Sequence, residues 1–199
     1  MEAYKKFLHK DPLFRPLLKT EIVLPTKSRN ITMSLVWSIL SQQLSIKVAK
    51  VMHQRFLNLF DGRFPRPEEI LKKSQAEIRA IGISERKASY IHNVAQFITL
   101  NKVTPGKLNK MSDEEIISFL SEIKGVGRWT VEMLLIFGLG REDVFALDDL
   151  GIQKGMIELF NLQELDKKEL KIKMEELSLR WSPFRSYVCL YLWKFSGFK

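Results

Sequence analysis

Hydrophobic residues recur with a helical period along nearly the whole of this 199-residue chain. In residues 84–98, for example, Ala88, Ile91, Ala95 and Ile98 lie three or four positions apart. That spacing places apolar side chains on one face of a helix. No segment has a convincing strand pattern, and no Asn-Gly turn is present. The pattern predicts an all-α protein.

Breaks and caps divide the first part of this pattern into separate helices. A short helix over residues 2–10 is expected to end at Asp11-Pro12. The longest apolar region, residues 31–60, is interrupted by the polar "SQQLS" at 41–45, where Ser45 can cap a second helix. One face of that second helix is expected to carry Val48, Val51, Met52, Phe56 and Phe60.

The remaining helices are also marked by local signals. Ser74 with Glu77, and Ser112 with Glu115, match the capping-box pattern. A linker is expected around Pro105-Gly106. The helix that follows Ser112 is expected to end at Ile123, and the next to run from about Arg128 to Leu139. Later helices are expected near 149–160, 165–180 and 183–196.

Composition and charge then narrow the class of protein. Hydrophobic residues make up 45% of the chain and charged residues 28%, which is typical of globular proteins. The length permits one core, or two small lobes that share a cleft. Lysine and arginine number 32 against 23 acidic residues, for a net charge of +9. This balance favours a polyanionic partner such as nucleic acid, with a merely solvated basic surface as the alternative.

Two further classes are disfavoured by what the sequence lacks. The single cysteine, Cys189, allows neither an internal disulfide nor a four-cysteine cluster, and it is expected to be a small core residue. No run approaches eighteen apolar residues, so no membrane span is expected. The first residues lack the apolar run of a signal peptide, which predicts an intracellular protein.

The stretch "IKGVGRWT" at residues 123–130 places two glycines in otherwise helical sequence. Each glycine inside a helix costs roughly 1 kcal/mol relative to alanine, so the turn requires bare backbone. A helix, a tight turn and a new helix form a helix–hairpin–helix. Gly125 can adopt a positive φ, and Gly127 leaves backbone N–H groups uncovered at the start of the second helix.

Those amides predict a phosphate-binding site. The helix dipole reinforces them, and Lys124 and Arg128 add positive charge on either side. The contact would be with the DNA backbone, which anchors a protein without reading sequence. An ordinary glycine-terminated helix followed by a close turn is the alternative.

Five segments together resemble a known family. "IKGVGRWT" resembles the hairpin of the helix–hairpin–helix DNA glycosylase superfamily, in which proline usually stands in place of Lys124. "VFALDDLGIQ" is similar to the segment that holds the catalytic aspartate of that superfamily. "ILSQQLSIKVA", "ISERKASYIHNVA" and "WSPFRSYVCLYLWKF" resemble its alkylpurine branch, the AlkA type of 3-methyladenine DNA glycosylase. The segments span about residues 31–196.

The resemblance implies an architecture. Two helical lobes with a cleft between them would form a single compact glycosylase unit over residues 1–199, with the hairpin at about 112–139. The N-terminal β domain of larger members of the branch has no counterpart in this sequence.

The resemblance also implies a chemistry. Members that use a lysine nucleophile carry it two residues after the second hairpin glycine, and here that position is Trp129. Without an amine there, a Schiff-base route loses its nucleophile, which implies a monofunctional enzyme that leaves an abasic site. Asp149 matches the catalytic carboxylate, which would stabilise an oxocarbenium-like sugar and orient or deprotonate water. Asp148 is expected to cap the helix; from the residues alone, capping is the ordinary role for either aspartate.

Substrate contacts follow from the same resemblance. The damaged base must be flipped into a pocket, for which Trp129, Trp193 and Met133 are the expected contacts, because aromatic faces attract a cationic purine. Trp37 and Trp181 are expected to be core residues instead. In "SQQLS", Gln43 is expected to fill the gap left by the flipped nucleotide and Gln42 to bond to neighbouring bases or sugars. A polar helix boundary is the alternative for both.

The implied activity is removal of alkylated purines, 3-methyladenine and 7-methylguanine foremost, from duplex DNA during base excision repair, by a DNA-associated monomer. No cofactor is required, and the single cysteine excludes an iron–sulfur cluster. A Na⁺ or K⁺ ion is implied at the hairpin, through the main-chain carbonyls of Ser121, Ile123 and Val126. Two alternatives stay open: a non-catalytic DNA-binding module, and a glycosylase for deaminated, oxidised or mismatched bases.

Overall fold

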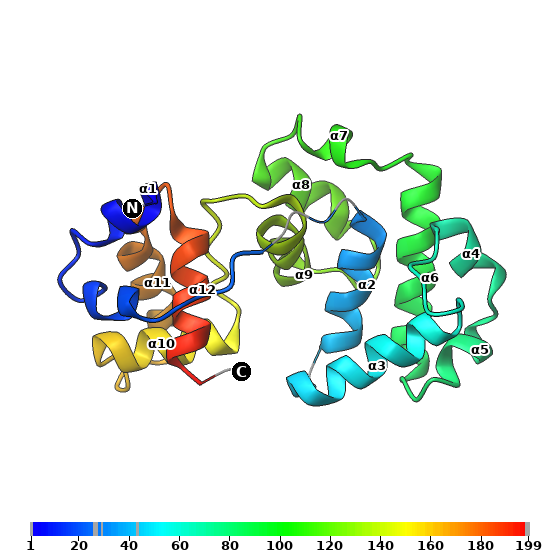
Figure 1. The fold of residues 1–199 in the computed structure, drawn as a ribbon, viewed down its shortest axis with the longest axis horizontal. Coiled ribbons are helices and arrows are strands. Elements are labelled where there is room, and N and C mark those ends of the chain that lie inside the picture. Colours follow the sequence, from blue (N-terminus) through cyan, green and yellow to red (C-terminus); the bar gives the residue numbers. More distant parts are fainter. Residues whose placement is uncertain (1, 26–27, 29, 43, 198–199) are drawn as a thin grey trace. The chain divides into compact units, whose positions relative to one another are not determined.

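Every regular element in the described part of the chain is a helix (Figure 1). The computed structural model describes residues 2–25, 28, 30–42 and 44–197. The chain divides into two compact units. The terminal unit comprises residues 1–25 and 140–199, and the central unit comprises residues 26–139. The expected all-α class with two helical lobes is confirmed; the single glycosylase unit and the cleft stay predictions.

The terminal unit is built from both ends of the chain. Its elements are α1 (Ala3–Leu8), the 3₁₀ helix η1 (Arg15–Lys19), α10 (Leu150–Phe160), α11 (Lys167–Ser178), the 3₁₀ helix η3 (Leu179–Trp181) and α12 (Arg185–Phe195). In its core, α10 packs on α12. Trp181 is buried, as expected, and its indole nitrogen donates to Asp11 at 2.9 Å. Cys189 is buried in α12 and is a core residue, as expected.

The central unit holds the helix–hairpin–helix. Its elements are α2 (Ile31–Ser41), α3 (Ile46–Asn58), α4 (Pro67–Lys72), α5 (Gln75–Arg79), α6 (Glu85–Leu100), α7 (Pro105–Leu108), α8 (Asp113–Ser121), α9 (Arg128–Met133) and η2 (Leu134–Leu139), a π-helical continuation of α9. The longest helix, α6, packs against α2, α4 and α5. Its predicted apolar face is confirmed, because all four residues are buried: Ala88, Ile91, Ala95 and Ile98.

Three predicted helix starts are confirmed in atomic detail. The hydroxyls of Ser45, Ser74 and Ser112 each accept a hydrogen bond from the backbone N–H three residues later. Glu77 and Glu115 complete the two capping boxes by accepting from the backbone N–H of their cap residues. Each such cap contributes about 1 kcal/mol to helix stability.

Three expectations about the central unit are wrong. The exposed fractions of Val48 and Val51 are 41% and 44%, so these two residues lie off the core face of α3, which carries the buried Ala49 instead. Further along α3, Phe56 is buried and packs edge-on to Trp37. Trp37 itself is half-buried and is not the core residue that was expected. The expected linker at Pro105-Gly106 forms the one-turn helix α7, because Thr104 caps it and Pro105 occupies its first position.

Candidate active site

Asp149 and Trp193 form a hydrogen-bonded pair in the terminal unit. Asp149 precedes α10, and its Oδ1 accepts from the backbone N–H of Ile152 at 3.0 Å. The same oxygen accepts from the indole Nε1 of Trp193, in the last turn of α12, at 2.7 Å. Both side chains are half-buried. Two donors from two helices therefore fix the orientation of this carboxylate, and the indole bond is of the strong, charge-assisted kind.

The expected division of roles between the two aspartates is wrong in one respect. Asp148 does not cap α10; its carboxylate forms an ion pair with Lys171 of α11. The helix begins at Leu150, one residue later than that assignment requires, so Asp149 occupies the cap position. Capping uses one oxygen of Asp149 as an acceptor and leaves the group a carboxylate, so a catalytic role is compatible with it.

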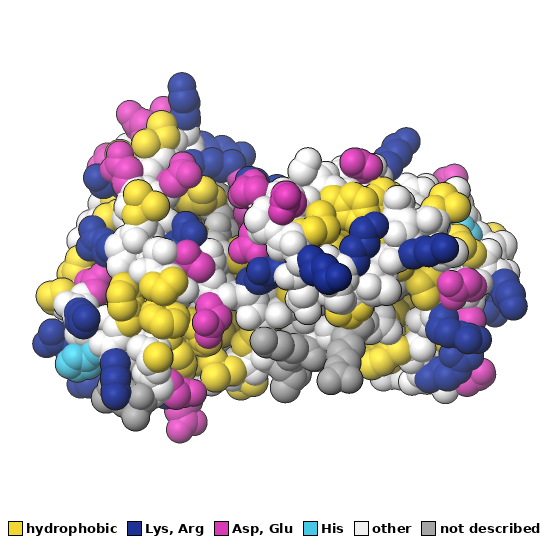
Figure 2. Space-filling view, turned by 90° about the horizontal axis from the view of Figure 1, so that it is seen from above, with side chains coloured by type: hydrophobic (Ala, Val, Ile, Leu, Met, Phe, Trp, Pro, Cys, Tyr) yellow, Lys and Arg dark blue, Asp and Glu magenta, His cyan; other side chains and the backbone are white. Residues whose placement is uncertain are grey.

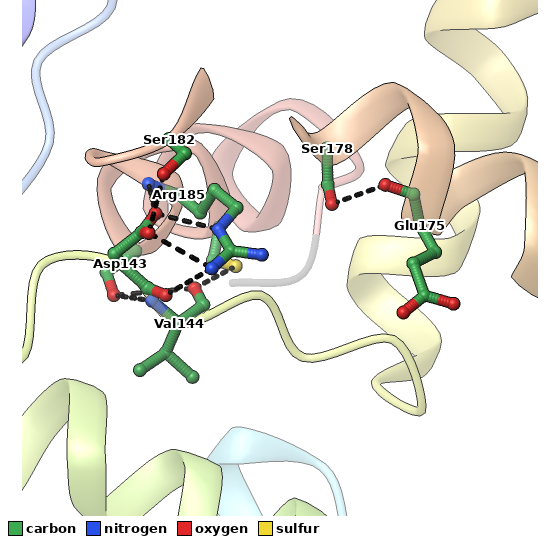
Figure 3. Close-up of polar contacts among 8 residues, drawn as sticks. Asp143, Val144, Glu175, Ser178, Ser182 and Arg185 are labelled. Atoms are coloured by element: carbon green, nitrogen blue, oxygen red, sulfur yellow. Dashed lines mark hydrogen bonds and ion pairs between the residues drawn. The ribbon is translucent and has the colours of Figure 1, made fainter. Parts of the chain in front are cut away.

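The loop that leads to Asp149 is bound to the start of α12 (Figure 3). The Arg185 guanidinium donates to Asp143 Oδ1 from Nε at 2.7 Å and to Oδ2 from Nη2 at 3.0 Å. Ser182 Oγ donates to the same carboxylate at 2.8 Å. Burial alone would raise the pKa of Asp143, but these hydrogen bonds outweigh it, and the pKa lies below its usual value. Asp143 is therefore held as a carboxylate.

The hairpin of the central unit explains why one of its glycines is required. Gly125 has φ +102°, as expected, and a Cβ there would lie 2.1 Å from the ring of Tyr90 in α6. The turn is closed by the Val126 N–H, which donates to the Ile123 carbonyl at 2.9 Å. Asn93 Nδ2 donates to the Lys124 carbonyl at 3.0 Å. The fold itself thus demands glycine at position 125.

Gly127 is different, because the fold does not demand it. Its backbone is extended (φ −103°, ψ 176°), and a Cβ there would meet nothing within 4 Å. It caps α9 without a side chain, at the point where the first amides of the helix begin. Bare backbone at this position leaves room for an outside group to approach those amides.

The two basic residues beside the turn differ in their surroundings. Lys124 is exposed. Arg128 donates to both oxygens of Glu114, at 2.6 and 3.1 Å, and lies 3.5 Å from Glu132 Oε1. The bond to Glu114 raises the pKa of Arg128. A phosphate contact by Arg128 would therefore compete with carboxylates that already bind it.

Gln42 connects the "SQQLS" turn to the second hairpin helix. It ends α2, and its Nε2 lies 3.4 Å from Thr130 Oγ1, next in sequence to Trp129. The Lys87 ammonium donates to the carbonyls of Gln42, at 2.8 Å, and Leu40, at 3.0 Å. Burial lowers the pKa of Lys87. Gln43, the expected plug, lies outside the described residues.

The expected base-contact residues are divided between the units. Trp129 is half-buried in α9, and Met133, one turn later, is 9% exposed. Both belong to the central unit, whereas Trp193 belongs to the terminal unit. Within single units, the structure brings Trp193 to Asp149 and Gln42 to the α9 segment.

Sequence reasoning missed the residues that support these groups. Lys87, Tyr90 and Asn93 lie three positions apart on α6 and hold the α2 end and the hairpin. Arg185 and Asp143 hold the loop before Asp149. With the exception of Asp143, these residues lie inside segments that carried the family resemblance, so the resemblance was the signal that could have found them.

Surface charge and metal sites add little to this picture. Lysine and arginine side chains are spread among acidic and apolar ones on the face drawn in Figure 2. In residues 2–25, 28, 30–42 and 44–197, no group of three or more His, Cys, Asp or Glu could hold a metal ion. The Ile123 carbonyl of the expected cation site accepts from Val126 N–H. No described helix is long and apolar enough to cross a membrane.

Comparison with known proteins decides the family. Residues 36–180 match the model of the HhH-GPD superfamily of base excision DNA repair proteins, and this segment contains both the hairpin and Asp149. The chain belongs to the HhH-GPD superfamily. The resemblance to the helix–hairpin–helix DNA glycosylases is thereby confirmed.

Individual HhH-GPD relatives are similar over most of their length. The chain is 41% identical over 165 residues to DNA-3-methyladenine glycosylase 1 of Schizosaccharomyces pombe, covering 81% of this chain and 71% of that protein. A solved 3-methyladenine DNA glycosylase of the same yeast, in complex with abasic DNA, superposes with a TM-score of 0.89 at 34% identity, covering 98% and 97% of the two chains. A DNA-3-methyladenine glycosidase of Bacillus halodurans superposes with a TM-score of 0.81 at 35% identity, covering 98% and 90%.

Proposed function

We propose that this HhH-GPD protein is a monofunctional DNA glycosylase that removes alkylated purines, 3-methyladenine and 7-methylguanine, from duplex DNA. The names of its relatives support this activity and DNA as the partner, since they are called DNA-3-methyladenine glycosylases and one is bound to abasic DNA. The protein would act as a DNA-associated monomer.

The observation that carries the proposal is the fixed carboxylate of Asp149. Its Oδ1 is held by the Ile152 N–H and the Trp193 indole. A carboxylate oriented in advance stabilises the positive charge that develops on the sugar as the glycosidic bond stretches. Such preorganisation costs no rearrangement at the moment of reaction, which is what distinguishes a catalytic group from a generic surface acid.

The reaction follows from that charge. The bond between C1′ and the purine nitrogen breaks, and its electron pair leaves with the base. A cationic alkylated purine leaves as a neutral molecule, so it needs no proton from the protein. The oxygen of a water molecule bonds to C1′, and its proton passes to the Asp149 carboxylate or to solvent. The products are the free base and an abasic site.

Trp129 supports the monofunctional assignment. Lysine at this position would supply an amine nucleophile, whereas an indole cannot form a Schiff base with the sugar. Trp129, Trp193 and Met133 are the proposed contacts of the flipped base, because a cationic purine is attracted to the negative face of an aromatic ring.

DNA contacts are proposed for the central unit. The uncovered amides after Gly127 would bind a backbone phosphate, and Lys124 beside them would add positive charge. Arg128 would join the contact by exchanging its bond to the Glu114 carboxylate for one to the phosphate. Gln42 and Gln43 would contact the DNA next to the flipped nucleotide. A Na⁺ or K⁺ ion held by the carbonyls of Ser121, Ile123 and Val126 is proposed for the hairpin, and no other cofactor.

The test is release of free bases from methylated duplex DNA, measured by chromatography. We expect 3-methyladenine and 7-methylguanine to be released, with strand cleavage appearing only after alkali. Duplexes that contain hypoxanthine or 8-oxoguanine are run beside it. Preferential release of those bases would move the protein to the deaminated or oxidised class, and binding without any release would make it a DNA-binding module.

A further inference from the structure

One face of α12 contacts the loop that leads to Asp149. Arg185, Cys189 and Trp193 lie four positions apart, a spacing that places them on the same side of the helix. Arg185 contacts Asp143, the Cys189 Sγ lies 3.6 Å from the Val144 carbonyl, and Trp193 contacts Asp149. Residues 143–149 are therefore attached to α12 at Asp143, Val144 and Asp149.

The attachment at Asp143 is the most extensive of the three. Arg185 donates to both carboxylate oxygens and also, from Nη2, to the Asp143 carbonyl at 3.0 Å. Figure 3 shows Ser182 and Arg185 pointing at this carboxylate together, with Val144 beside it. Ser186 adds a backbone attachment, because its hydroxyl accepts from the Val144 N–H at 2.9 Å. Because the guanidinium binds both the carboxylate and the main-chain carbonyl of the same residue, it fixes the position and the orientation of Asp143 together.

The helix that supplies these contacts is itself held against α10. A Cβ on Gly155 would lie 3.1 Å from the Leu192 carbonyl oxygen, so the two helices meet backbone to backbone. Leu192 is next in sequence to Trp193. The loop thus runs between two fixed points, α12 at Asp143 and the start of α10 at Asp149.

We propose that Arg185 is a positioning residue for the glycosylase reaction: by binding Asp143 at two points it sets the register of residues 143–149, and through it the place of the Asp149 carboxylate. This inference rests on the proposed function. Arg185 contacts no reacting atom and acts through Asp149.

Magnitudes separate this role from a stabilising one. The Arg185 and Asp143 side chains are 27% and 30% exposed, and ion pairs that reach solvent contribute little to stability. Catalysis is far more sensitive, because a displacement of about 1 Å in a catalytic group can cost about a hundredfold in rate. We call the contacts of Arg185 with Asp143 the clamp. Loss of the clamp should therefore change the excision rate much more than the melting temperature.

The experiment measures single-turnover excision of 7-methylguanine with enzyme in excess, and the Kd for duplex DNA that contains an abasic-site analogue. We expect Arg185→Met to lower the rate between about 10- and 100-fold, with Kd within about twofold of wild type and melting lowered by no more than about 4 °C. Arg185→Lys should recover part of the rate, since lysine can make one of the two carboxylate contacts.

Two controls accompany it. Arg180→Met removes a different ion pair of the same unit, that of Arg180 with Asp11, and should leave the rate within about twofold of wild type. Asp143→Asn and the double variant Asp143→Asn/Arg185→Met test the clamp as a unit. Because each single change breaks the same contact, the double variant should lie within about threefold of the slower single one.

The outcomes are distinct. An unchanged rate in Arg185→Met, a Kd that weakens in parallel with the rate, or additive losses in the double variant would each overturn the positioning role while leaving the glycosylase intact. A wild-type protein that releases no base would overturn the proposed function and this inference with it. If Arg185→Met does not fold, Arg185→Lys and Ser182→Ala carry the same comparison, with losses of about 2- to 10-fold at unchanged Kd.

Discussion

Trp193 donates its indole N–H to Asp149 Oδ1 across 2.7 Å, so the aromatic residue and the carboxylate are held as one group. From the sequence, the two residues have separate expected roles, one in contact with the base and the other at the sugar. The hydrogen bond adds an orienting role to Trp193, and it can be tested apart from the ring.

Trp193→Phe keeps an aromatic ring but removes the N–H donor. A hydrogen bond to a charged group contributes about 1.5–3 kcal/mol, so we expect the single-turnover rate of 7-methylguanine excision to fall about 10- to 100-fold. Trp37→Phe is the matched control. Trp37 stacks on His53 and has no part in the proposed reaction, so this change should leave the rate unchanged. A wild-type rate in Trp193→Phe would mean that the indole contributes only its ring.

The two hairpin glycines should separate stability from DNA binding. In Gly125→Ala, the positive φ and the clash with Tyr90 should lower the free energy of unfolding by about 2 kcal/mol or more. In Gly127→Ala, the new methyl group meets open space, so the free energy of unfolding measured in urea should change by less than about 1 kcal/mol. Affinity of Gly127→Ala for duplex DNA should nevertheless fall about tenfold, because a phosphate can no longer approach the backbone. Wild-type affinity in this variant would argue against the phosphate site.

Lys87→Met removes the ammonium that binds the Leu40 and Gln42 carbonyls. Methionine keeps most of the apolar stem, so the main loss is the anchoring of the turn that carries Gln42. We expect Kd for duplex DNA with an abasic-site analogue to rise about tenfold. Arg86→Met removes the same charge from the neighbouring exposed position of α6 and should change Kd by less than about threefold. Equal effects of the two variants would reduce Lys87 to a source of general positive charge.

His53 predicts a pH dependence of stability. Burial against Trp37 disfavours the charged imidazole, and the bond to the Trp37 carbonyl only partly opposes it, so the pKa of His53 lies below its ordinary 6.5. The unfolded chain therefore binds a proton at a higher pH than the folded chain. Stability from this residue is complete above pH 6.5 and is lost as the pH falls below it. When the pH is lowered from 7.5 to 5.5, the melting temperature of wild type should fall further than that of His53→Gln. Equal falls in the two proteins would exclude His53 as the cause.

Local pattern predicted most of the helices but not how far each reaches into the core. Ser45, Ser74 and Ser112 could be placed as caps because a cap depends only on residues within one turn. The exposure of Val48 could not be predicted, because it depends on which side of α3 packs against other helices, and the buried side carries Ala49. The sequence predicts Asp148 as the cap because the resemblance gives Asp149 the catalytic role, and spacing alone locates a helix start only to within a residue or two.

The candidate site was accessible from sequence only in part. Asp149 and Trp193 stand in segments that resemble a family, and the resemblance supplies their expected roles. The roles of the hairpin glycines follow from the turn itself. The contacts that hold them join residues far apart in the chain, such as Asp143 with Arg185 and Gln42 with Thr130. No local period encodes such pairs. The family resemblance marks the segments that hold most of these residues, but the contacts that they make come from the structure.

The most direct test of the account compares Asp149→Asn with Asp148→Asn in single-turnover excision of 7-methylguanine, with DNA affinity measured for each. Asparagine at 149 keeps an acceptor for the α10 cap and the Trp193 indole but removes the charge, so the fold should persist. We expect Asp149→Asn to lose a hundredfold or more, roughly, in rate at unchanged affinity, and Asp148→Asn to stay within about twofold of wild type. Full activity in Asp149→Asn, or a comparable loss in Asp148→Asn, would contradict the assignment of the catalytic carboxylate.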